Sequence, residues 1–363
     1  MDFENYGLIE QPFIDVSVID VSSKDKRVNG DLYAEKAAHG KLEALLRRIR
    51  QKQTISYVSS QSAELGSGKS ALMAAAYWKL RKERHDVSPI WAQATGGISA
   101  GPTVGRVIDA IISAGHTEKL RQKVGSFTFT AVKDLLSKSY NIPSTQISGK
   151  LAEILELPET EIAQKFTNVR RSLLTYSAVD FFGYFLSLFV AAGLPRFVIF
   201  LDQFEEYVQA HTGRASLQKL GDDFRDLIQG ASTKTSLVLS LHSEAEEILN
   251  GIGYVRRVAQ IDQNTKITIE PLQEQDGVEL AKKYLSAYRP SKYTGSEIFP
   301  FEPKVIEHIT KTVDGNAGDL MKALGNAITR GLDTETDQIT MEFLGEPRNY
   351  VSILGKPPPK HLS

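Results

Sequence analysis

The sequence predicts an α/β fold: a parallel five-stranded sheet with helices on both faces, a helical insertion, and a small C-terminal α-helical domain. Short apolar runs rich in β-branched residues alternate with longer amphipathic stretches, which is typical of a parallel sheet covered on both faces. The apolar runs show little polar alternation, as expected of strands that are buried on both sides. Only amphipathic stretches follow the last strand, and they predict the helical domain.

The order of the elements follows from these patterns. The expected strands are residues 54–59, 88–94, 197–201, 236–241 and 266–269. The expected helices of the same region are residues 70–83, 103–114, 178–192, 216–228 and 244–249. Three further helices are expected at residues 276–287, 303–313 and 319–332.

The chain divides into four parts on this reading. Residues 1–40 form an N-terminal entry segment, and residues 41–275 form the core with the sheet. The stretch of about 97–190 is too long for one crossover helix and is expected to be a helical insertion. Residues 276–345 form the helical lid domain, and residues 346–363 form a proline-rich tail.

Composition excludes several classes of function. The 363-residue chain has a formal net charge of −1, so DNA contact is not indicated by net charge and would need a local basic patch. It contains no cysteine, which removes disulfides, thiolate metal sites and cysteine nucleophiles. The N-terminus is acidic, and Pro195-Arg196 interrupts the most apolar window. We therefore expect a cytoplasmic protein with no membrane segment.

A phosphate-binding loop is the most informative motif. The run Ala63-Glu64-Leu65-Gly66-Ser67-Gly68-Lys69-Ser70 lies between an expected strand and an expected helix. Its two glycines let backbone N–H groups turn toward a phosphate, and the helix N-terminus adds a favourable field. Lys69 would reach the β- and γ-phosphates, and the Ser70 hydroxyl would bind Mg²⁺. These residues predict that the chain binds a nucleoside triphosphate.

An acidic strand end supplies the second half of the expected site. The apolar strand that ends in Asp202 has the Walker B pattern, with Asp202 as the second residue that organises Mg²⁺. Many ATPases place a glutamate directly after this aspartate, but this chain has Gln203. Glu205 and Glu206 are the candidates to activate water, and we favour Glu205.

Three smaller features complete the candidate site. At the end of the fourth strand, Ser240 or His242 would sense the γ-phosphate, or would serve the structure alone. Ser243 with Glu246 is expected to form a helix capping box. Arg256 and Arg257 would reach the γ-phosphate of a neighbouring subunit, or are solvated charges.

These motifs resemble the additional-strand P-loop ATPases that include the AAA+ and STAND proteins. The Leu201–Glu206 run is similar to the STAND and NACHT-like Walker B, and Tyr6-Gly7-Leu8 with Pro12-Phe13 resembles the entry segment of replication-initiator and transposition-regulator AAA+ ATPases. The run that begins Gly315-Asn316-Ala317-Gly318 is similar to the start of their second-sensor helix, with Lys322 as the nearest basic residue. The resemblance implies ATP as the nucleotide.

Two functions remain open at this stage. The first is a magnesium-dependent ATP hydrolase that forms homo-oligomers and regulates or loads a separate effector or DNA-processing protein. The second is a STAND-like signalling scaffold, such as an antiviral defence or mobile-element regulator, in which ATP binding drives assembly and hydrolysis is slow. Gln203 favours the scaffold. A small-molecule kinase is disfavoured because no acceptor-binding signature is present.

The basic stretch from Lys41 to Lys52 has two interpretations. It is a contact for DNA or for another subunit, or it is the solvated face of an amphipathic helix. The spacing of its leucines favours the second.

Overall fold

The computed structural model describes most of the chain outside the expected insertion. The described residues are 2–14, 16, 18–33, 40–60, 66–94, 107, 110, 111, 113–116, 119, 186, 189, 193–210, 213–231 and 235–359. The expected helices 103–114 and 178–192 therefore lie mostly outside the described residues, as does the insertion at about 97–190. Within the described residues, no helix is long and apolar enough to cross a membrane.

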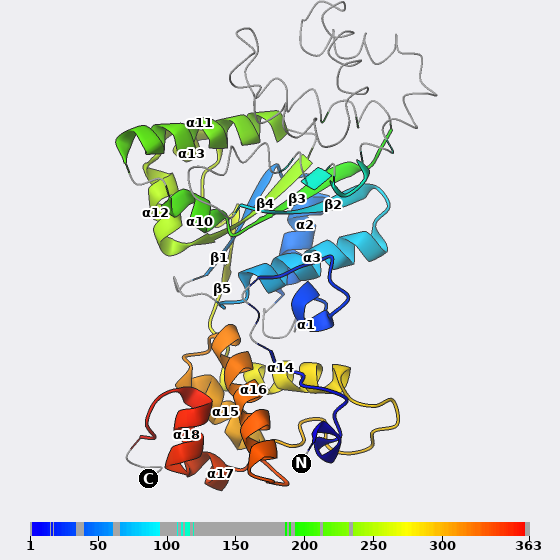
Figure 1. Ribbon diagram of the computed structural model, residues 1–363. Coiled ribbons are helices and arrows are strands. Elements are labelled where there is room, and N and C mark those ends of the chain that lie inside the picture. The colour runs from blue at the N-terminus through cyan, green and yellow to red at the C-terminus, as the bar shows by residue number, and fades with distance from the viewer. Residues whose placement is uncertain are drawn as a thin grey trace, which may run out of the picture. The chain divides into compact units, whose positions relative to one another are not determined.

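Five strands form one sheet in the order β2-β3-β4-β1-β5, and the α/β fold class is confirmed (Figure 1). The strands are β1 (Ile55–Ser60), β2 (Val87–Gln93), β3 (Arg196–Asp202), β4 (Thr235–His242) and β5 (Lys266–Ile269). Strands β2, β3 and β4 pair in parallel, with Phe200 opposite Trp91 and Val238. Strand β4 is inserted between β1 and β3, which is the additional strand that the sequence resemblance implied.

The helices around the sheet are α2 (Lys41–Arg50), α3 (Lys69–Glu83), α10 (Phe204–Gln209), α11 (Arg214–Ala231), α12 (Ser243–Gly251) and α13 (Gly253–Val258). They include those expected at residues 70–83, 216–228 and 244–249, and the short helices α10 and α13 are additional. Figure 1 shows α10 to α13 on one side of the sheet and α2 with α3 on the other. Strands β1, β3 and β4 are buried on both faces, as their continuous apolar sequence requires, whereas the edge strands β2 and β5 are partly exposed.

Side chains alternate between the two faces of the sheet. Ile199 and Leu201 of β3 pack with Leu220 and Phe224 of α11 in one core cluster. Phe200, between them, lies in edge-to-face contact with Tyr77 of α3, with ring centroids 6.2 Å apart. The core of the sheet is therefore double, with one apolar layer on each side.

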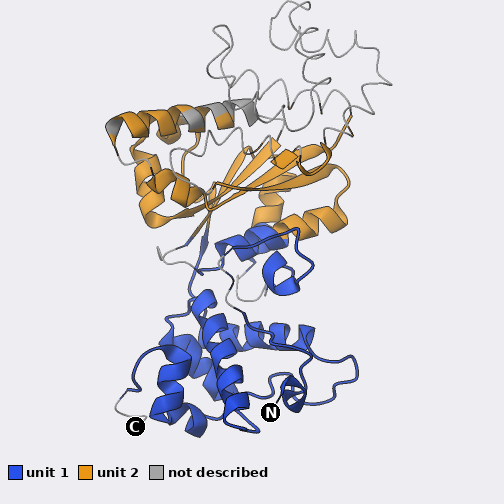
Figure 2. Ribbon diagram, in the orientation of Figure 1, with its two compact units in different colours: residues 1–44, 60–75, 268–363 blue, residues 45–59, 76–267 orange. Residues whose placement is uncertain are grey.

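The other described helices are η1 (Phe3–Tyr6), α1 (Lys26–Asn29), α14 (Glu274–Ala287), α15 (Pro303–Thr312), α16 (Ala317–Asp333), α17 (Met341–Gly345) and α18 (Pro347–Leu354). They all contribute to a second core, except α1, which has no residue in it. Figure 2 shows the two compact units: residues 1–44, 60–75 and 268–363 form the helical unit, and residues 45–59 and 76–267 form the sheet unit. The phosphate loop thus belongs to the helical unit and Asp202 to the sheet unit.

The N-terminal segment is part of the helical unit's core. Tyr6, Leu8 and Phe13 are buried in the same cluster as Leu324 of α16. The approach is closest at Gly325, where a Cβ atom would lie 2.7 Å from the carbonyl oxygen of Phe13. Glycine is required there because no side chain fits between helix and segment.

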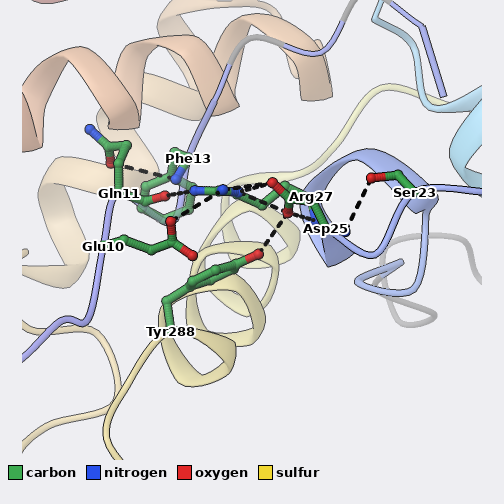
Figure 3. A network of polar contacts seen from close by, with 7 residues as sticks. All are labelled: Glu10, Gln11, Phe13, Ser23, Asp25, Arg27 and Tyr288. Carbon is green, nitrogen blue, oxygen red and sulfur yellow. Dashed lines mark hydrogen bonds and ion pairs between the residues drawn. The ribbon is translucent and has the colours of Figure 1, made fainter. Parts of the chain in front are cut away.

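A polar network joins Asp25 and Arg27, which lie at the start of α1, to Tyr288 at the end of α14 (Figure 3). Arg27 donates to the Asp25 carboxylate at 2.6 Å and to the carbonyl of Gln11, and its guanidinium lies 4.9 Å from the ring centre of Tyr288. The Tyr288 hydroxyl donates to Asp25 at 3.0 Å. The hydrogen bond from Arg27 lowers the pKa of Asp25 to about 2.

The C-terminal region differs from the expected tail. Residues 346–363 were expected as a proline-rich tail, but residues 347–354 form α18, whose Tyr350 and Ile353 are buried in the helical core. Pro347 lies in the first turn of α18, where the missing N–H would have had no partner in the helix. The proline therefore begins a helix here.

Candidate nucleotide-binding site

The described part of the phosphate loop has the backbone that phosphate binding requires. Gly66 and Gly68 lie in the left-handed region, at φ values of 86° and 91°. A side chain would be strained at either position, and a Cβ atom at Gly68 would meet no neighbour within 4 Å. Ala63, Glu64 and Leu65, the first three residues of the motif, lie outside the described residues.

Helix α3 begins at Lys69, directly after the glycines, so its first amide groups lie at the end of the loop. The Lys69 side chain is buried, and its ammonium donates to Ser67 Oγ at 3.2 Å and to Ser60 Oγ at 3.4 Å. Ser60 is the last residue of β1, so both ends of the loop position the ammonium. Ser70 follows in the first turn of α3 and is partly exposed. An ammonium, left-handed glycines and a helix N-terminus together fit a phosphate group.

The loop also contacts the start of α16 within the helical unit. The amide of Gly318 donates to the carbonyl of Gly66 at 2.9 Å. Asn316 caps α16 through its Oδ1, which accepts from the amides of Gly318 and Asp319, and a Cβ atom on Gly66 would lie 2.7 Å from this oxygen. The lid helix is thus packed backbone to backbone against the phosphate loop. Lys322, the expected basic residue of this helix, instead lines an open cavity of about 430 Å³ between α16 and the end of α18.

The acidic strand end lies in the sheet unit. Asp202 is the last residue of β3 and is 1% exposed, at the carboxyl edge of the sheet. Gln203 follows with φ of 55°, a left-handed residue that turns the chain directly into α10. The Oε1 of Gln203 is buried without a hydrogen-bond partner among the described residues. Residues Phe204–Gln209, which follow this turn, form α10.

This turn separates the two candidate glutamates. Glu205 is buried, and its carboxylate accepts a hydrogen bond of 2.5 Å from the hydroxyl of Ser240 on β4. The same hydroxyl accepts from the amide of Phe204 at 3.2 Å. Glu206, one residue later, is exposed. Of the two, only Glu205 is held in a fixed position beside the end of β4.

Ser240 and His242 have structural partners in this arrangement. Ser240 holds Glu205, a role that the sequence did not indicate because the contact joins β4 to helix α10, 35 residues apart in the chain. His242 is the N-cap of α12, and its Nδ1 accepts from the amide of Ala245 at 3.2 Å. The expected capping box at Ser243 and Glu246 is therefore wrong by one residue, because a histidine nitrogen replaces the serine oxygen at the cap.

The two arginines of α13 are exposed and bound to nearby carbonyls. Arg256 donates to the carbonyl of Asn250 at 3.1 Å, and Arg257 donates to the carbonyl of Gly253 at the same distance. Asn250 lies in the last turn of α12, where carbonyl groups lack a partner within the helix, and Gly253 is the first residue of α13. The exposure of the two arginines leaves both accessible to another molecule.

Comparison with known proteins gives structural similarity at low sequence identity. No protein-family profile and no curated protein sequence matches the chain. The ADPNP–ADP complexes of the ORC2 protein from Aeropyrum pernix are similar, at 12% identity and a TM-score of 0.47 over 93% of this chain and 69% of that one.

Two other solved structures are similar over comparable lengths. Cdc6p from Pyrobaculum aerophilum has 13% identity and a TM-score of 0.49, over 93% of this chain and 72% of its own. Domain III of the replication initiation protein DnaA from Thermotoga maritima has 9% identity and a TM-score of 0.41, over 90% of this chain and 95% of its own. All three similarities have TM-scores below 0.5 and identities of 13% or less.

Proposed function

We propose that the chain is a magnesium-dependent ATPase of the AAA+ type that works as a conformational switch in a homo-oligomer. The observation that carries the proposal is the phosphate loop, with its two left-handed glycines and buried Lys69 at the start of α3. Residues 63–70 would bind the triphosphate, with Lys69 on the β- and γ-oxygens.

The donor set also fits Mg²⁺. Ser70 offers a hydroxyl and Asp202 a buried carboxylate, both hard oxygen ligands of the kind that this ion prefers. Bound Mg²⁺ would neutralise charge on the phosphate oxygens. Glu205, held by Ser240, would orient water and accept its proton, and Glu206 is the less suited acid because it is exposed.

The switch would come from the contact between the phosphate loop and α16. Because Gly66 is hydrogen bonded to Gly318, a change in the loop on ATP binding or hydrolysis would act directly on the lid helix. Arg256 or Arg257 of a neighbouring subunit would complete the site. The partner of the switch would be a separate effector or a DNA-processing protein.

The second candidate, a STAND-like scaffold with slow hydrolysis, is favoured by one observation. Gln203 occupies the position directly after Asp202, in a left-handed turn, where a glutamate could act as a base. In this case ATP binding would drive assembly. Glu205 would then have a structural role, linking α10 to β4 through Ser240.

Steady-state ATPase assays and mass measurement separate the two candidates. The proteins to compare are the wild type, Glu205→Gln, Glu206→Gln and the double variant Arg256→Ala with Arg257→Ala, each with and without ATP and Mg²⁺. Turnover that is lost in Glu205→Gln and the arginine variant but kept in Glu206→Gln supports the hydrolytic switch. Assembly with negligible turnover supports the scaffold. A chain that does not bind ATP, or that binds it equally well after Lys69→Ala, would overturn both.

A further inference from the structure

Basic side chains gather at the amino-terminal edge of the sheet, opposite the edge that carries Asp202. Helix α2 ends just before β1, and α3 ends just before β2, so both helix ends lie where strands begin. Residues 47–53 contain four lysines and arginines, and residues 79–86 contain four more against two acids, Glu83 and Asp86. The whole chain has a net charge of −1, so this concentration of positive charge is local.

Arg196, at the start of β3, shows that the two helix ends belong to one surface. Its guanidinium donates to the carbonyl of Ile49 on α2 at 2.8 Å and to Ser236 Oγ at 2.9 Å. Its amide donates to the carbonyl of Asp86, in the turn after α3, at 3.2 Å. The end of α2 and the turn after α3 therefore flank the same residue.

Most of the cations at this edge point to solvent. Arg47, Arg50 and Lys52 are exposed at the end of α2, and Arg81 and Lys82 are exposed at the end of α3. Of the two acids, Asp86 accepts a hydrogen bond from the guanidinium of Arg84. This hydrogen bond lowers the pKa of the Asp86 carboxyl. That ion pair is neutral, and the five exposed cations outnumber the two remaining acids, Glu83 and the Asp262 whose charge acts on Arg48.

An aromatic ring lies among these cations. Trp78 is partly exposed on α3, and the guanidinium of Arg81 and the ammonium of Lys82 lie 5.4 Å and 5.8 Å from the centre of its ring. Cations beside a partly exposed indole match the two components of a single strand of nucleic acid, its phosphates and its bases. A duplex would also use the cations, but its bases are stacked on one another and offer the ring no free face.

We propose that this edge, defined by Arg47, Arg50, Lys52, Arg81, Lys82 and Trp78, binds the backbone of single-stranded nucleic acid without sequence specificity. The cations neutralise phosphates, and Trp78 stacks on a base. The seven residues of β3 separate this edge from Asp202 by about 20 Å. Nucleic acid and ATP therefore bind at different edges of the sheet, and this inference does not depend on the proposed ATPase activity.

Fluorescence anisotropy with a labelled mixed-sequence 20-mer DNA tests the proposal, in single-stranded and duplex form, at 50 and 200 mM salt. The edge variant combines Arg47→Ala, Arg50→Ala, Arg81→Ala and Lys82→Ala. The control variant is Lys304→Ala with Lys311→Ala, which removes exposed cations from α15. Thermal melts establish that each variant is folded.

The wild type and the control should bind single strands with a steep salt dependence. The edge variant should bind at least tenfold more weakly and with a slope of log Kd against log salt that is lower by about one for each lost phosphate contact. Trp78→Ala should weaken single-strand binding about fivefold or more and leave the salt slope unchanged.

Equal binding by the edge variant and the control would overturn the proposal. So would binding of the wild type to phosphatidylserine vesicles with no binding to the DNA, because it would assign the edge to a membrane surface. Preference for the duplex with no effect of Trp78→Ala would overturn the stacking role.

Discussion

The amide of Gly318 donates a hydrogen bond of 2.9 Å to the carbonyl of Gly66, which joins the first turn of the lid helix α16 to the phosphate loop. Both residues are glycines for a steric reason. A Cβ atom on Gly318 would lie 2.8 Å from Gly66 Cα, and one on Gly66 would lie 3.0 Å from Gly318 Cα. The two backbones are therefore as close as they can be, and a shift of either one moves the other.

The first prediction is that Gly318→Ala weakens ATP binding. The new methyl group pushes α16 away from the loop and breaks the hydrogen bond, whose net worth is about 1 kcal/mol, or about a fivefold higher Kd. Isothermal titration calorimetry measures the change. Gly251→Ala is the control, since it adds a methyl group in a helix where nothing lies within 4 Å. Unchanged affinity in Gly318→Ala would show that the contact has no part in nucleotide binding.

The second prediction concerns the pair Glu205 and Ser240. Ser240→Ala removes two buried hydrogen bonds, one to the Glu205 carboxylate and one from the Phe204 amide. The carboxylate and the amide then remain buried without this partner. We expect ATP turnover to fall about tenfold or more while the affinity for ATP stays within twofold, because the acid is misplaced and the phosphate loop is not touched. Kinetics at saturating ATP, with Kd measured separately, gives both numbers.

Ser243→Ala, three residues further on, is the matched control because Ser243 is exposed. It should leave turnover unchanged. If Ser240→Ala lowers ATP affinity and leaves turnover unchanged, Ser240 senses the nucleotide and does not position Glu205.

Local sequence patterns predicted the elements of the fold, and long-range contacts explain what they missed. The strands were placed to within a residue or two because continuous apolar runs and Gly-rich turns are local signals. The glycine-rich turn before α3 is a local signal of the same kind. Ser240 was a candidate sensor, but its partner Glu205 is 35 residues away and no local pattern joins them. The contact of Gly66 with Gly318 spans most of the chain, and its only sequence signal is a pair of glycines.

The same reasoning explains the two places where the structure differs from the sequence-based prediction, the N-cap of α12 and residues 347–354. Histidine at an N-cap is uncommon, so Ser243 was the better local choice, although the chain enters α12 one residue earlier. The prolines at 357–359 predict an extended, proline-rich tail over residues 346–363. Tyr350 and Ile353 are buried in the same core as residues of α16, and this packing stabilises the helix α18.

The third prediction is that Asp25→Asn destabilises the chain at neutral pH and not at pH 2. The folded pKa of about 2 lies below the ordinary value of 3.8, so the stabilisation is fully present above about pH 4 and is lost as the pH falls through 2. Allowing for partial exposure of the carboxylate, we expect a loss of about 1–2 kcal/mol at pH 7. Urea unfolding at pH 7 and pH 2 measures it, with Glu335→Gln, an exposed carboxylate, as the control. An equal loss at both pH values would contradict the role of the charge.

The fourth prediction is that His116 makes the chain less stable in mild acid. His116 is buried with its ring 5.2 Å from that of Phe197, and burial lowers its pKa from 6.5 to about 4. Above pH 6.5 neither the folded nor the unfolded chain binds this proton. Between pH 6.5 and 4 the unfolded chain binds it and the folded chain does not, so the free energy of unfolding falls by on the order of 2–3 kcal/mol.

Urea unfolding at pH 7.5, 6, 5 and 4.5 tests this expectation. His116→Gln removes the titrating group, so its free energy of unfolding should change less over this range than that of the wild type. His85→Gln, at an exposed histidine of the sheet unit, should keep the pH dependence of the wild type. Because the pKa of Asp25 acts only below about pH 4, its effect does not overlap with this window. A wild type and a His116→Gln variant with the same pH dependence would place the acid sensitivity in other groups.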